Sequence, residues 1–232
     1  MFEFSADEWT AIALSARVAT TAVIFSLPLA IGLGWLLARK NFAGKSLLDG
    51  FLHMPLVLPP VVTGYLLLLA FGRQGPIGAW LYDWFGVTLA FRWTGAALAA
   101  AVMGFPLMLR AIRLSFETID RRLEGAAGTL GASPLWTFAL VSLPLAAPGV
   151  LVGAILSFAK ALGEFGATIT FVSNIPGQTQ TIPSAIYAYT QVPGGEAGAL
   201  KLTCISILIA LAALVAAEML GARARRRIAD FE

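Results

Sequence analysis

The sequence predicts an all-α protein, a single domain (residues 1–232) built as a polytopic bundle of about five transmembrane helices. Of the 232 residues, 58% are hydrophobic and only 12% are charged, whereas a soluble domain has about 25% charged residues. The apolar residues form long runs, and each run must be a helix of about 20 residues because hydrocarbon offers the backbone no hydrogen bonds. The predicted spans are residues 11–38, 48–71, 95–111, 145–162 (or 145–171) and 200–220.

The charges of the connecting segments predict the orientation of these spans. One set of connections contains Arg39, Lys40, Lys45, Arg110, Arg113, Arg121, Arg122, Arg223, Arg225, Arg226 and Arg227. The other set contains Glu3, Asp7, Glu8, Arg73, Asp83, Arg92 and Glu196. The positive-inside rule places the first set in the cytoplasm. Five spans then leave the N-terminus outside and the C-terminus in the cytoplasm.

The rarer residue types exclude several kinds of site. Cys204 is the only cysteine and His53 the only histidine, so neither a disulfide framework nor a metal site is expected. No phosphate-binding loop of the Walker type is present. The net charge of +3 comes from residues at span ends, which does not predict nucleic-acid binding. We therefore expect no cofactor bound by this chain, and any ATP hydrolysis must occur in another protein.

Prolines interrupt several of the predicted spans. A proline frees a backbone carbonyl, which is tolerated in a membrane where neighbouring protein or a watery cavity satisfies it. The run Leu58-Pro59-Pro60-Val61-Val62-Thr63-Gly64 is unusual enough to favour a segment that lines a cavity. Packing kinks alone are the alternative. Pro59, Pro60 and Thr63 are the residues that we predict to line a translocation pathway here.

The segment between the third and fourth spans, residues 115–144, predicts two short helices with a sharp stop between them. Asp120 is a good N-cap, and the charge of Glu124 in the first turn suits the helix dipole. Gly131 is placed to end the first helix in a left-handed conformation. Ser133 followed by Pro134 then starts the second helix. Small residues at 125–128 permit close approach to another surface, while the two glycines weaken the helix by about 1 kcal/mol each.

At these residues the chain resembles the coupling loop of ATP-binding-cassette importer permeases, known as the EAA loop. The family pattern is matched at the correct spacing by Ala126, Ala127, Gly131, Val141, Leu143 and Pro144. Gly125 occupies the position of the motif glutamate, and Glu124 lies one residue earlier. The resemblance implies that this loop docks into a cleft on an ATPase subunit. The predicted coupling residues are Arg121, Arg122, Glu124, Gly125, Ala126, Ala127, Gly131, Leu143 and Pro144.

A wider resemblance covers nearly the whole chain. Residues 53–62, 81–86, 105–113 and 162–177 are similar to the permeases of bacterial molybdate importers. This resemblance implies the type I importer permease fold in the bacterial inner membrane, with a periplasmic N-terminus. It also implies a homodimeric pore, two cytoplasmic ATPase subunits that bind ATP and Mg²⁺, and a periplasmic oxyanion-binding protein. Tungstate and sulfate or thiosulfate permeases are close relatives, so those oxyanions remain alternatives to molybdate.

Two charged residues in the fourth span are also candidates for the anion pathway, since charges inside spans are costly and often functional. Lys160 and Glu164 lie one helical turn apart and can pair. Lys160 would attract an oxyanion while Glu164 limits the strength of binding, and the hydroxyl of Thr168 would help to pass the anion on. The alternative is a pair that snorkels at the membrane boundary.

Two other classes of function are alternatives to an ATP-driven permease. A membrane-embedded enzyme needs a cluster of His, Asp, Glu or Ser at one interface, and the sequence shows none. A channel or proton-coupled carrier favours several intramembrane carboxylates and internal repeats, which are not evident. Co-purification of an ATPase and inhibition of uptake by vanadate would separate an ATP-driven permease from a carrier.

Overall fold

The structure, a computed structural model, describes residues 4–229, with side chains described as far as residue 223. The side chains of Arg225, Arg226 and Arg227 in the predicted cytoplasmic set therefore lie outside the described residues. Within residues 4–229 there is no strand, which confirms the all-α prediction. The elements are α1 (Ala6–Arg39), α2 (Lys45–Val57), α3 (Pro60–Phe71), α4 (Pro76–Phe85), α5 (Trp93–Glu117), α6 (Arg121–Thr129), α7 (Pro134–Thr137), the π-helix η1 (Phe138–Ser142), α8 (Leu143–Leu162), α9 (Gly166–Val172), α10 (Ile182–Thr190) and α11 (Glu196–Ala229).

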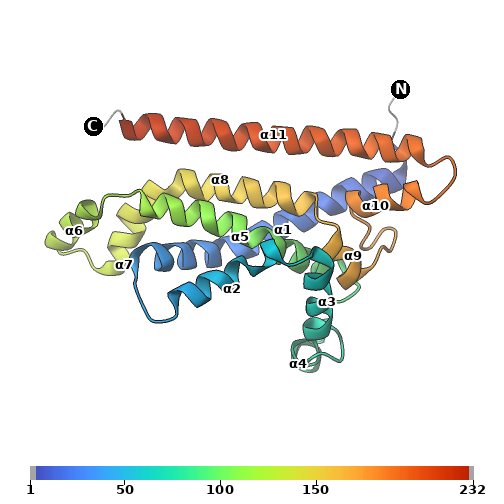
Figure 1. Cartoon of the computed structure of the whole chain (residues 1–232), viewed down its shortest axis with the longest axis horizontal. Coiled ribbons are helices and arrows are strands. Elements are labelled where there is room, and N and C mark those ends of the chain that lie inside the picture. The colour runs from blue at the N-terminus through green and yellow to red at the C-terminus, as the bar shows by residue number, and fades with distance from the viewer. Residues whose placement is uncertain (1–3, 230–232) are drawn as a thin grey trace.

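The body of the molecule is a bundle of four long helices, α1, α5, α8 and α11, that run side by side along its longest axis (Figure 1). Helix α5 packs closely against α1 and α8, and α11 lies on the outer side of α8. Small residues permit these close contacts, as in many membrane bundles. A side chain at Gly104 would collide with Ser157, and one at Gly149 would collide with Ser115. These two glycines therefore lie at contacts between helices.

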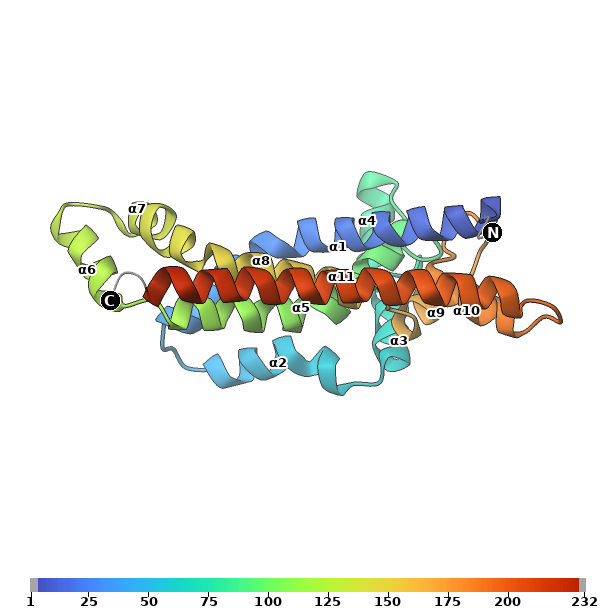
Figure 2. The ribbon, with the colours of Figure 1, turned by 90° about the horizontal axis from the view of Figure 1, so that it is seen from above.

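The bundle contains about the predicted number of spans. Four helical segments are long and apolar enough to cross a membrane: Ala6–Arg39, Trp93–Glu117, Pro134–Leu162 and Glu196–Arg223. The pair α2 and α3 would make a fifth. Figure 2 shows α2 at one edge of the bundle, beside rather than among the long helices.

The prediction that residues 48–71 form one continuous span was wrong. Helix α2 ends at Val57 and α3 begins at Pro60, and their axes differ by 114°. The Pro59-Pro60 pair favours this break, because a proline ring disfavours the helical conformation of the residue before it and supplies no N–H. Helix α3 therefore runs across the long axis of the bundle and carries α4 at its far end (Figure 1).

The boundaries of the fourth span also differ from the prediction. The fourth span is predicted to start at residue 145, but the helical path runs from Pro134 to Leu162 without a break. The π-helix η1 ends at Ser142, two residues before Pro144, and the N–H of Leu143 donates to the carbonyl of Phe138. This wider turn accommodates a residue that has no N–H of its own. The alternative end at residue 171 was wrong, since α8 ends at Leu162 and α9 is a separate helix.

Candidate functional site

The loop that carries the predicted coupling residues lies at one end of the molecule (Figure 1). A carboxylate oxygen of Asp120 accepts a hydrogen bond of 2.9 Å from the N–H of Arg122 and caps α6. Gly131 has a φ of +89° and follows the end of α6. The N–H of Ala132 donates to the carbonyl of Ala127, and that of Gly131 to the carbonyl of Gly128. These two bonds form a Schellman motif, which confirms the predicted stop.

The second part of the loop begins as the sequence predicts. Ser133 is the N-cap of α7, and its hydroxyl accepts a hydrogen bond of 3.4 Å from the N–H of Trp136. Pro134 occupies the first position of the helix. The loop therefore consists of α6, a tight turn at residues 130–133, and the first turns of the long path that becomes α8.

The outward surface of this loop combines glycines with exposed apolar side chains. No described atom lies within 4 Å of the position that a side chain would take at Gly125 or Gly128. Leu130 is 89% exposed, and Leu135 and Trp136 are also exposed. Arg121 and Arg122 are exposed at the start of α6. Apolar side chains gathered on a charged loop outside the spans are typical of a protein-docking surface.

Glu124 is the exception, because its carboxylate turns inward. Its Oε1 accepts hydrogen bonds from Arg39 Nε at 3.0 Å and from Ser142 Oγ at 2.7 Å. Arg39 is the last residue of α1, and Ser142 is the last residue of η1. Sequence reasoning missed both partners, since they lie 85 and 18 residues away in the chain.

Pro60 and Thr63, two of the predicted pathway residues, belong to α3, which packs across α9. A side chain at Gly64 would collide with Ala167, and one at Gly166 would collide with Pro60. The two helices therefore touch backbone to backbone beside the break in the second span. Thr63 lies in this region and is buried, yet among the described residues its hydroxyl has no hydrogen-bond partner.

Lys160 and Glu164 form the expected ion pair, with 2.8 Å between Lys160 Nζ and Glu164 Oε2. The glutamate side chain is 1% exposed and the lysine side chain 33% exposed. Oε1 of Glu164 also accepts a hydrogen bond of 3.0 Å from the N–H of Ala167, so the carboxylate caps α9. The hydroxyl of Thr168 donates to the carbonyls of Phe165 and Glu164. Glu164 and Thr168 thus stabilise the first turn of α9, and Lys160 is the partly exposed member of the ion pair.

A cluster of charged residues that the sequence did not single out joins α2 to α5. Arg113 contacts Asp49 at 2.9 Å and Glu117 at 2.8 Å. The ring of His53 lies 3.3 Å from the carboxylate of Asp49. These four side chains, with Arg110 and Leu114, line a cavity of about 440 Å³. No group of three metal-ligating side chains occurs among the described residues.

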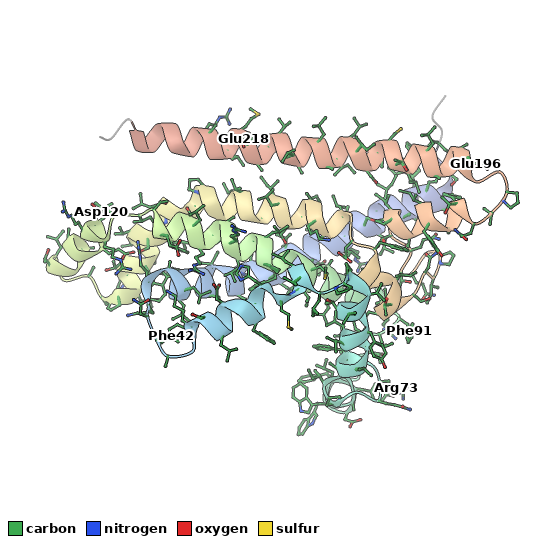
Figure 3. The ribbon with its side chains drawn as sticks, viewed as in Figure 1. Phe42, Arg73, Phe91, Asp120, Glu196 and Glu218 are labelled. Carbon is green, nitrogen blue, oxygen red and sulfur yellow. The ribbon has the colours of Figure 1, made fainter. Side chains whose placement is uncertain are left out.

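The two sets of connecting segments lie at opposite ends of the bundle. Figure 3 shows Phe42 and Asp120 toward one end, and Arg73, Phe91 and Glu196 toward the other. The loop formed by α6 and α7 is therefore at the end that holds the clustered basic residues, and α3 with α4 lies toward the other end.

Comparison with known proteins identifies the family. Residues 30–226 match the family described as "Binding-protein-dependent transport system inner membrane component". The chain is 60% identical to the molybdenum transport system permease protein ModB of Escherichia coli strain K12, over 95% of this chain and 96% of that protein. It is 56% identical to the corresponding protein of Haemophilus influenzae, again over 95% and 96% of the two chains.

Solved structures support the same fold. A chain of a bacterial ABC transporter involved in the import of the acidic polysaccharide alginate aligns with a TM-score of 0.69 at 16% identity, over 96% of this chain and 80% of that one. Its likeness shows the architecture alone. From the family match and the two relatives, the chain belongs to the inner-membrane components of binding-protein-dependent transport systems.

Proposed function

We propose that this protein is the permease subunit of an ATP-driven importer that carries molybdate into the cytoplasm. The observation that carries the proposal is the 60% identity, over nearly the full length of both chains, to a molybdenum transport system permease protein. The exposed loop at one end of the bundle supports the coupling role. Two copies of the chain would act with two cytoplasmic ATPase subunits, which bind ATP and Mg²⁺, and with a periplasmic oxyanion-binding protein.

The break between α2 and α3 supports the pairing of two copies. Helix ends leave backbone groups without intrahelical partners, and such ends are tolerated at membrane depth only against protein or water. Pro59 and Pro60 are exposed in the single chain, as are Val61 and Val62. The same face holds an apolar cavity of about 550 Å³ between α1, α2, α3 and α5. A second copy against this face would cover the break and enclose a shared pathway.

The orientation follows from the charge distribution. The end with α6 and α7 contains Arg39, Lys40, Arg121 and Arg122, and the positive-inside rule places such an end in the cytoplasm. The N-terminus, α4 and α10 would then face the periplasm. The coupling loop is thereby on the side where ATP is available, and the binding protein would deliver its anion at the opposite side.

The anion would pass close to Lys160. Its side chain is one-third exposed, and its amino group lies next to the buried Glu164 carboxylate, so its attraction for a dianion would be moderated rather than lost. Pro59, Pro60 and Thr63 would line the neighbouring wall, together with Thr168. A weak site suits transport, because the anion must leave as readily as it arrives.

Reconstituted uptake tests this function directly. Permease, ATPase and binding protein in liposomes should take up radioactive molybdate only with ATP, and vanadate should stop uptake. Collapse of the proton gradient should leave it unchanged. Excess tungstate should compete more strongly than sulfate, because tungstate is closest to molybdate in size. Uptake that needs the proton gradient and ignores vanadate would instead support a carrier.

The docking role of the loop is tested by a bulky charge on α6. Ala127→Glu should reduce the amount of ATPase that co-purifies by about tenfold or more, since an unpaired charge in a docked interface costs several kcal/mol. Ala43→Glu is the matched control, because Ala43 is exposed in the neighbouring turn between α1 and α2. Equal loss of ATPase from both variants, or from neither, would contradict docking through α6. Amounts of permease in the membrane should stay equal.

The role of Lys160 is tested with a neutral pair. Lys160→Gln alone leaves the buried Glu164 carboxylate without its partner. Removing one partner of a buried ion pair destabilises the folded protein by about 3–5 kcal/mol. The double variant Lys160→Gln with Glu164→Gln removes both charges and should recover normal membrane levels. We expect its molybdate uptake to remain about tenfold or more below wild type, because a charge-assisted hydrogen bond of about 1.5–3 kcal/mol is lost. Full recovery of uptake would show that the pair is structural only.

A further inference from the structure

The coupling loop is joined to the end of the first span by a charged contact. Arg39 closes α1, and its side chain is only 7% exposed. Its guanidinium donates to Oε1 of Glu124 at 3.0 Å and to the carbonyl of Ile119 at 3.2 Å. One arginine therefore holds both the segment that leads into α6 and a carboxylate on α6 itself.

The same carboxylate oxygen also binds the start of the fourth span. The hydroxyl of Ser142 donates to Glu124 Oε1 at 2.7 Å, and Ser142 is buried. Ser142 ends η1, whose Phe138 packs on Trp35 of α1 and on Phe116 of α5. Glu124 thus links α6 to α1 and to the π-helix through two short hydrogen bonds.

Helix α6 has few other attachments. None of its residues is buried, and glycines at 125 and 128 lower its own stability by about 1 kcal/mol each. The turn at residues 130–133 joins it to α7, and Arg121 adds a long contact of 3.5 Å to the carbonyl of Ala38. The hydrogen bonds of Glu124, at 3.0 and 2.7 Å, are therefore the shortest side-chain contacts between α6 and the spans.

We propose that Glu124 is a positioning residue that makes α6, the end of α1 and η1 move as one body. The proposal rests on the proposed function and adds to it: a docked ATPase would push α6, and Glu124 would transmit that displacement to α1 and α8. Glu124 would serve the loop from inside, through Arg39 and Ser142, while the outward face of α6 meets the ATPase.

Transport efficiency in the assembled complex tests this role. In Glu124→Ala the ATPase should still co-purify at the wild-type ratio and hydrolyse ATP. The molybdate moved per ATP should fall by about two- to thirtyfold, the range found for residues that carry coupling. Arg39→Ala should also lower the molybdate moved per ATP, and the loss in the double variant should be smaller than the two single losses combined, because both remove the contact between Arg39 and Glu124. Glu117→Ala is the control, since it breaks an ion pair within α5 that does not involve α6, α1 or η1.

Two further experiments complete the test: swapping the charges of Arg39 and Glu124, and measuring amide hydrogen exchange. Arg39→Glu with Glu124→Arg should recover part of the lost efficiency. In the complex without molybdate, Glu124→Ala should speed amide exchange in both α6 and residues 138–142, as local opening becomes easier. The milder Ser142→Ala should give a smaller change in the same two segments.

Hydrogen exchange needs no substrate, so its result is independent of whether the cargo is molybdate. Two results would overturn the positioning role. One is unchanged exchange at residues 138–142 in both Glu124→Ala and Ser142→Ala. The other is loss of the ATPase from Glu124→Ala but not from Arg39→Ala, which would make Glu124 a direct contact with the ATPase.

Discussion

The need to satisfy every backbone polar group inside a membrane governs this structure. In the long helices, the helical hydrogen bonds satisfy the backbone N–H and carbonyl groups. Other partners are needed where the helical path stops, at residues 58–59 and 163–165. The fold brings these two breaks together, because α3 crosses α9 with glycines at both contacts. The carboxylate of Glu164 satisfies one N–H at the start of α9. The break at Pro59 remains exposed in the single chain, and the proposed second copy and watery pathway would cover it.

The coupling loop combines an exposed surface with an attachment to the spans. In its proposed role it would present a surface to a soluble partner while staying attached to the spans. Small residues on α6 provide the surface, and Glu124 provides the attachment to Arg39 and Ser142. The π-helix that ends at Ser142 also accommodates Pro144, so one local irregularity serves both the attachment and the continuation into α8.

Much of this architecture was predictable because it depends on local chemistry. Runs of apolar residues located the spans, and Asp120, Gly131, Ser133 and Pro134 located both short helices, since caps act within a few residues. What could not be predicted depends on contacts between distant segments. The partners of Glu124 and the tie between Asp49 and Arg113 need the tertiary fold. The Pro59-Pro60 pair signalled an interruption, but it did not predict the 114° angle between α2 and α3 or the packing of α3 on α9.

The surroundings of α3 give the most direct test of the central claim, that the broken span faces protein or water rather than lipid. A nitroxide at Val61→Cys and one at Leu208→Cys on α11, both exposed in the single chain, would be compared in the assembled complex after Cys204→Ala. Leu208 should be strongly relaxed by oxygen, which concentrates in lipid, and barely by a water-soluble nickel complex. Val61 should show weak oxygen relaxation. An oxygen-dominated signal at Val61, equal to that at Leu208, would place the break in lipid and contradict the account.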